Sequence, residues 1–191
     1  MPISWIRENL AGAWAVMNGD SAGLTRLDTS IEGFWKSFGA IVLVLAFSLP
    51  VLLAEPALLA ENATGEPPAA GPTALRFVAV AVDWVTFPLL FALLARPLGL
   101  ASQFVPYIAC RNWSSVIVAG VYGAVLLPYV AGLLPAAVVP YLLFAVFGLA
   151  LRFSYMVART ALGVPAGLAI PIVILEVLVS LVVEFTIGRV G

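Results

Sequence analysis

The sequence contains no histidine, one cysteine and one lysine among its 191 residues. A chain of this composition has too few ligands for an internal disulfide, a Cys/His zinc site, an iron–sulfur cluster or a histidine-ligated haem. It also lacks the side chain that most often acts as a general base near neutral pH. We therefore expect no metal and no cofactor, and we interpret Cys110 as a small apolar packing residue.

Charge is scarce as well. Only 10% of the residues are charged and 63% are hydrophobic, with a mean hydropathy of +1.11. A soluble domain carries about 25% charged residues. The formal net charge of −1 offers no basic surface to a nucleic acid. We therefore expect an all-α integral membrane protein whose main surroundings are the lipid bilayer, and no nucleic-acid partner.

Residues 1–33 are predicted to form a separate N-terminal segment, because the first long apolar run begins near Phe34. A secretory signal peptide differs, since its short basic region leads directly into an apolar core. Apolar residues recur at spacings of three and four in Ile3, Ile6, Leu10, Trp14 and Met17. This pattern predicts a short amphipathic helix. That helix either lies in the membrane interface or packs on the protein's own cytoplasmic face.

Five apolar segments are each long enough to cross a bilayer, which takes about 20 helical residues at 1.5 Å each. Together they form a predicted transmembrane domain over 34–191, with spans at 34–53, 75–95, 113–130, 136–158 and 165–187. The third span has an alternative range. Residues 97–112 form an interfacial segment in the first version. In the second, a tight turn starts the helix at once, giving 99–127 and leaving Arg111 inside the bilayer.

Two features predict where the first span begins and ends. Thr29 with Glu32 three residues later matches a capping box, so we expect Thr29 to be the N-cap. Prolines, glycines and glutamates interrupt the apolar pattern over residues 55–74. This composition predicts an exposed loop.

The basic residues near the spans predict the orientation. Seven lie on the side of the N-terminus: Arg7, Arg26, Lys36, Arg96, Arg111, Arg152 and Arg159. Only Arg76 and Arg189 lie on the other side. We therefore expect a cytoplasmic N-terminus and a periplasmic C-terminus. The preference for arginine, alanine, valine and leucine favours a bacterial origin, and hence the inner membrane.

Ionisable residues within the spans are the candidate site residues, because a charge at mid-bilayer costs about 2.5–3.5 kcal/mol on insertion scales. In the tight-turn version Asp83 and Arg111 would both lie about 20 Å from the turn, and could form a buried ion pair. Otherwise Arg111 belongs to a cytoplasmic loop, and Asp83 is protonated or bound elsewhere.

Glu176, Ser180 and Glu184 follow one another at intervals of four residues, which places them in one stripe roughly 12 Å long. Such a stripe could carry protons or coordinate a cation. In the alternative, Glu184 reaches the outer interface or pairs with Arg76. Glu176 is then protonated and hydrogen-bonded between helices.

Small residues form two overlapping small-xxx-small pairs in the third span: Ala119, Gly120, Gly123 and Ala124. This pattern is typical of helices whose backbones approach closely. The sequence contains no P-loop, HExxH or GxSxG motif, so we expect no enzymatic activity. It also shows no internal repeat that would indicate the inverted halves of many transporters.

Residues 28–47 (DTSIEGFWKSFGAIVLVLAF) and 111–117 (RNWSSVI) resemble small bacterial multi-pass membrane proteins of about this length. The plan of five helices with a cytoplasmic N-terminus is similar to that of the Yip1-like family, a likeness of helix number and size. Neither resemblance implies a catalytic or binding residue.

Two functions fit these features. The first is a non-catalytic accessory subunit or scaffold that packs against other membrane protein subunits. Short loops and the lack of a chemical motif favour it. The alternative is a small permease or ion-coupled transporter that uses the carboxylates of Asp83, Glu176 and Glu184.

Overall fold

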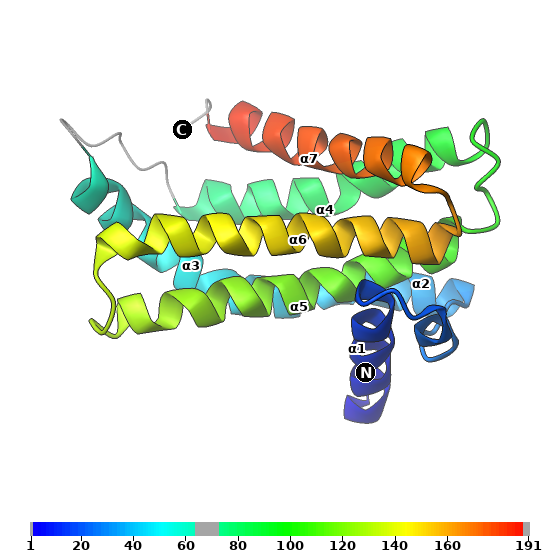
Figure 1. Cartoon of the computed structure of the whole chain (residues 1–191), viewed down its shortest axis with the longest axis horizontal. Coiled ribbons are helices and arrows are strands. Elements are labelled where there is room, and N and C mark those ends of the chain that lie inside the picture. Colours follow the sequence, from blue (N-terminus) through cyan, green and yellow to red (C-terminus); the bar gives the residue numbers. More distant parts are fainter. Residues whose placement is uncertain (1, 64–72, 189–191) are drawn as a thin grey trace.

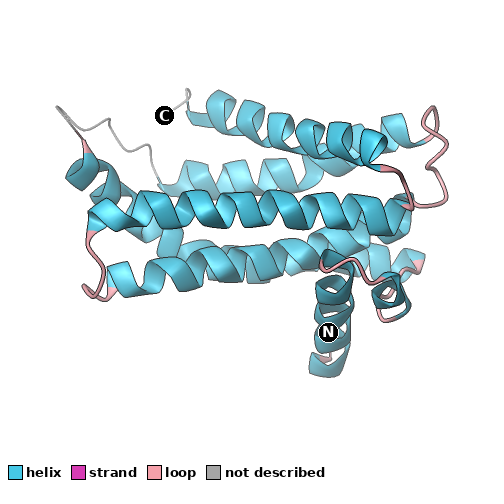
Figure 2. Cartoon of the chain, viewed as in Figure 1, coloured by secondary structure: helices cyan, strands magenta, loops and turns pink. Residues whose placement is uncertain are grey.

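The computed structural model describes residues 2–63 and 73–188, and no strand occurs in these ranges (Figure 2). The helices, in chain order, are α1 (Ile3–Met17), η1 (Ser21–Thr25), α2 (Ile31–Ser37), η2 (Phe38–Ala40), α3 (Ile41–Asn62), α4 (Thr73–Ala95), α5 (Phe104–Val130), η3 (Ala136–Val138), α6 (Val139–Leu162) and α7 (Ala166–Gly188). The expected all-helical class is thus present.

Five segments are long and apolar enough to cross a membrane: Ile31–Asn62, Leu75–Ala95, Phe104–Val130, Ala136–Leu162 and Ala166–Ile187. They run side by side along the longest axis of the molecule (Figure 1). Large apolar side chains on their outer faces are exposed, for example Leu93 and Phe144. Such extensive apolar exposure is unfavourable in water and favourable in lipid.

The five long helices form two groups. Helix α5 packs closely on both α3 and α6, and we call these three helices the three-helix group. Helix α4 packs chiefly on α7 and only weakly on α3 and α5 (Figure 1). We call α4 and α7 the helix pair.

Helix α1 crosses the bundle direction near the end that holds the 96–103 and 163–165 turns, which we call the α1 end (Figure 1). Its residues Ala13, Val16 and Met17 are fully buried against α5, α6 and η1, whereas Ile3 and Trp14 are exposed. Helix α1 is therefore packed on the protein itself, and the exposed side chains of Ile3 and Trp14 are available to a membrane interface.

The chain after α1 is attached to it by hydrogen bonds at Asp28. The Trp5 indole N–H donates to Asp28 Oδ2 (3.0 Å), and the Asp28 backbone N–H donates to Asn9 Oδ1 (3.0 Å). The Ser30 hydroxyl donates to Asp28 Oδ1 (2.6 Å) and lowers the pKa of that carboxyl, as does the Trp5 indole. Because its pKa is lowered in the fold, the ionised carboxyl holds this attachment at neutral pH and loses it in acid.

The first span differs from its predicted ends. Ser30, and not Thr29, is the N-cap, since its hydroxyl accepts the backbone N–H of Gly33 (3.0 Å). The helix then continues to Asn62, so residues 55–62 of the predicted loop are helical. Residues 64–72 of that loop lie outside the described residues. In lipid, unwinding at Pro50 or Pro56 would expose backbone groups without water, so the helix continues through both prolines.

The third span begins at Phe104, which lies between the two predicted starts. Arg111 and Asn112 belong to α5, so the interfacial segment predicted over 97–112 is wrong for residues 104–112. Turns occupy residues 96–103, and the tight turn is therefore longer than predicted. The other spans agree with their predicted ranges within about four residues at each end.

The small-residue pair Ala119 and Gly123 lies where α5 crosses α3. A Cβ at Gly123 would overlap with the backbone carbonyl oxygen of Phe47, and Ala119 is buried. The other pair does not make such an approach, because a Cβ added at Gly120 would meet nothing within 4 Å and Ala124 is exposed. The close helix approach therefore depends on Gly123.

We expect Gly123→Ala to destabilise the protein by about 1–3 kcal/mol, the usual cost of overpacking. Gly120→Ala is the matched control, and should be neutral or stabilising by up to about 1 kcal/mol, since alanine favours helix. Thermal unfolding of both variants in one mild detergent measures the difference. Equal stability of the two variants would contradict the close contact between α3 and α5.

Candidate functional site

Polar side chains from three helices meet inside the bundle. Arg111 of α5 donates through Nε to Glu176 Oε1 of α7 (2.5 Å), and its Nη2 lies 3.9 Å from Asp83 Oδ2 of α4. The Ser180 hydroxyl donates to Asp83 Oδ1 (2.9 Å). We call these four residues the Arg111 cluster. The cluster contains both residues of the predicted ion pair, Asp83 and Arg111, and two residues of the predicted stripe, Glu176 and Ser180.

The closest partner of Arg111 is Glu176, although the sequence predicted Asp83. Helix α5 begins at Phe104, which places Arg111 only about 10 Å from the α1 end of its helix. Glu176 lies about 15 Å from the start of α7, and Asp83 about 18 Å from the end of α4. The carboxylate of Glu176 is therefore nearer to Arg111 in depth.

The guanidinium of Arg111 is almost completely shielded. Its side chain is 8% exposed, and its Cζ lies 4.7 Å from the centre of the Phe87 ring. Within the described part of the chain, Nη1 has no hydrogen-bond partner. A charge in such surroundings is retained only because carboxylates and a ring face compensate it.

The formal charges of the Arg111 cluster do not cancel. One guanidinium faces two carboxylates, so the cluster carries −1 when all three groups are ionised and is neutral when it holds one proton. A net charge buried in a bilayer is costly. The arrangement therefore favours uptake of one proton or one monovalent cation.

The Arg111 cluster opens into a cavity of about 560 Å³, which we call the main cavity. All five long helices line it, and Arg111 and Glu176 lie in its wall. Hydroxyl groups supply much of its polarity: Ser48, Ser114, Ser115, Ser154, Tyr107 and Tyr122. Tyr107 and Tyr122 lie about 22 Å apart along α5, which is most of the roughly 30 Å of a hydrocarbon core.

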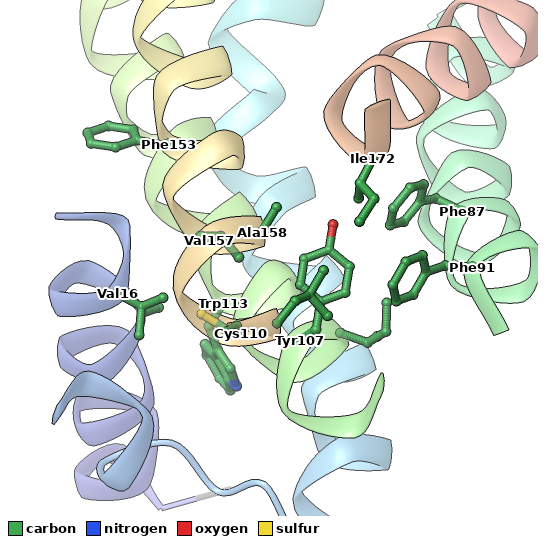
Figure 3. Close-up of a cluster of buried hydrophobic side chains, with 14 of the residues drawn as sticks. Val16, Phe87, Phe91, Tyr107, Cys110, Trp113, Phe153, Val157, Ala158 and Ile172 are labelled. Atoms are coloured by element: carbon green, nitrogen blue, oxygen red, sulfur yellow. The ribbon is translucent and has the colours of Figure 1, made fainter. Parts of the chain in front are cut away.

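An apolar layer lies between the Arg111 cluster and the α1 end. Tyr107 of the three-helix group meets Phe87, Phe91 and Ile172 of the helix pair (Figure 3), all of them almost fully buried. The ring centres of Tyr107 and Phe91 are 4.9 Å apart. These buried side chains fill the space between the Arg111 cluster and the ends of α4, α5 and α7.

A second ion pair lies beyond the other end of the main cavity. Arg76 of α4 pairs with Glu55 of α3. These residues are one helical turn beyond Val80 and Val51, which line the cavity on the same two helices. Both ion-pair sites therefore connect the helix pair to the three-helix group, with the cavity between them.

Glu184 stands apart from the cluster. It is exposed, lies about 12 Å from Glu176 along α7 and lines the main cavity. Its predicted pairing with Arg76 is wrong, because Arg76 pairs with Glu55. Within residues 2–63 and 73–188, no group of three or more His, Cys, Asp or Glu side chains is placed to hold a metal ion.

Comparison of the chain with protein-family models, with curated proteins and with solved structures gives no match. The resemblances to small bacterial membrane proteins and to the Yip1-like family therefore stay predictions. The main cavity and the Arg111 cluster are the features from which a function can be assigned.

Proposed function

We propose that this protein is a small permease that carries a polar or amphipathic solute through the main cavity and exchanges a proton at the Arg111 cluster. The cavity supports this proposal most strongly. It has the volume of a small-molecule site, about 300–1,000 Å³, and its lining residues on α5 extend about 22 Å, from Tyr107 to Tyr122. A scaffold that acts only by packing has no need of a charged, hydroxyl-lined interior.

The two ion-pair sites suggest how access could change. Both connect the helix pair to the three-helix group, which otherwise meet where α7 packs on α6 and at a few contacts of α4 with α3 and α5. Asp83 lies farther from Arg111 than Glu176 does, so it is the carboxylate that takes the proton, and its protonation would weaken the link between α4 and α5. The apolar layer at Tyr107 and Phe91 could then separate, and the cavity would open at the α1 end.

The proposal includes a location and an orientation. The apolar helices are those of a membrane-embedded protein, and we place it in the bacterial inner membrane with the N-terminus in the cytoplasm. Five of the seven basic residues counted on that side lie at the α1 end, as the positive-inside rule expects, whereas Arg111 and Arg152 lie within α5 and α6. Arg189, counted on the other side, and the C-terminus lie outside the described residues.

The test is proton flux into liposomes. We expect the purified protein, in vesicles of phosphatidylethanolamine and phosphatidylglycerol, to dissipate an imposed pH gradient faster than empty vesicles. Asp83→Asn should reduce this flux at least ten-fold, since an amide keeps the hydrogen bond from Ser180 but exchanges no proton. A pH-sensitive dye trapped inside the vesicles reports the flux.

Glu61→Gln is the matched control. Glu61 accepts a hydrogen bond from the Tyr129 hydroxyl (2.9 Å) and does not line the main cavity, so its replacement should leave the flux unchanged. A wild-type flux no greater than that of empty vesicles would reject the permease and favour the accessory subunit. Equal flux in wild type and Asp83→Asn would reject the role of the cluster.

A further inference from the structure

The main cavity does not end between the helices. A second hollow of about 420 Å³ lies between α6 and α7 and shares four lining residues with it: Ala150, Ser154, Glu176 and Glu184. The main cavity therefore continues sideways, between the three-helix group and one member of the helix pair.

An apolar groove of about 310 Å³ continues from that second hollow. The two share Phe147, Leu151 and Val177. Ile174 and Leu178, which also line the groove, are exposed on the outer face of α7. The three hollows thus form one path from the Arg111 cluster to the surface that faces lipid.

The two ends of this path differ in chemistry. The inner, polar end carries Glu176 in the Arg111 cluster and the exposed Glu184 about 12 Å farther along α7, whereas the groove is apolar apart from the Tyr155 hydroxyl. Along α6 the groove extends about 12 Å from Tyr155 to Phe147. A polar end and an apolar end of these proportions match an amphiphile, with its head in the cavity and its chain in the groove.

The charges at the inner end select the head group. Glu176 already has Arg111 as its partner, whereas Glu184 has no ion pair within residues 2–63 and 73–188. Glu184 lies in the wall of both the main cavity and the second hollow. A carboxylate there is complementary to a positively charged group, and it would repel an anionic one.

We infer that the solute is a membrane amphiphile with an amine head and an apolar chain, which enters sideways from the bilayer between α6 and α7. This inference rests on the proposed permease for the use of the site, but binding can be measured without transport. The solute would therefore reach the protein from the lipid phase and not from water.

The test uses dodecylamine as the probe, with the purified protein in a mild non-ionic detergent. A ligand that binds only the folded state raises the unfolding temperature in a saturable way. We expect dodecylamine to bind at least ten-fold more tightly than dodecanol, which lacks the charge, and than butylamine, which lacks the chain. Glu184→Gln should remove at least ten-fold of the preference for the amine over dodecanol.

A pair of variants on α6 tests the sideways path. Ala150 lines both the main cavity and the second hollow, so Ala150→Phe should fill the connection and weaken dodecylamine binding at least ten-fold. Ala145 is exposed on the same helix and lines none of these hollows, and Ala145→Phe should leave binding unchanged.

Equal affinities for dodecylamine and dodecanol in the wild type would overturn the choice of an amine head. Equal weakening by the two phenylalanine variants would overturn the entry path. Failure of this inference differs from failure of the permease. A protein that conducts protons without binding dodecylamine rejects only the amphiphile, and one that binds dodecylamine without any flux rejects only the permease.

Discussion

Replacing Arg111 with methionine is expected to lower the free energy of unfolding by about 3–5 kcal/mol, which is typical when one partner of a buried ion pair is removed. The loss arises because Glu176 and Asp83 remain in the bundle without the guanidinium that compensates them. Methionine keeps an unbranched side chain against Phe87, so most of the packing is retained. Reversible unfolding in mixed detergent micelles measures the effect.

Double-mutant cycles distinguish the two carboxylates. Glu176→Gln combined with Arg111→Met should recover more of the loss than Asp83→Asn combined with it, because Glu176 is hydrogen-bonded to Arg111 at 2.5 Å and Asp83 lies at 3.9 Å. Ser180 gives Asp83 a further partner, which reduces its dependence on Arg111. Additive losses in both cycles would contradict the Arg111 cluster.

The number of long helices could be predicted because a bilayer imposes a minimum apolar length on each span. Their ends were harder to predict. Pro50 and Pro56 are usually signs of a helix end in water, yet α3 continues through both. Ser30, and not Thr29, is the N-cap because the Asp28 carboxylate orients the Ser30 hydroxyl. The capping-box pattern compares only the N-cap with the residue three positions later, so it does not include this contact with Asp28.

The site was predicted in parts. Asp83, Arg111 and Glu176 were identifiable because charges are rare in apolar segments. That these three residues meet in one cluster could not be predicted, since residue spacing indicates depth along each helix but not which helices are neighbours. The predicted pair assumed that consecutive helices α4 and α5 pack together, whereas α4 packs chiefly on α7. The cavity hydroxyls, such as Ser154 and Tyr122, carry no signal that separates them from ordinary packing residues.

Reaction of a cavity cysteine with a water-soluble reagent is the second large effect that we expect. Ser154 lines the main cavity on α6, and Ala145 faces outward on the same helix. Each can be replaced by cysteine after Cys110, which is fully buried, is changed to alanine. A thiol in an aqueous cavity ionises and reacts, whereas a thiol in lipid does not.

This reaction also tests the central claim most directly, namely that the main cavity is a passage and not a gap in the packing. In liposomes treated with a membrane-impermeant cationic methanethiosulfonate, we predict that Ser154→Cys is modified at least ten-fold faster than Ala145→Cys. Equal and negligible modification of the two variants, with both proteins folded, would show that the cavity excludes water and would contradict the permease.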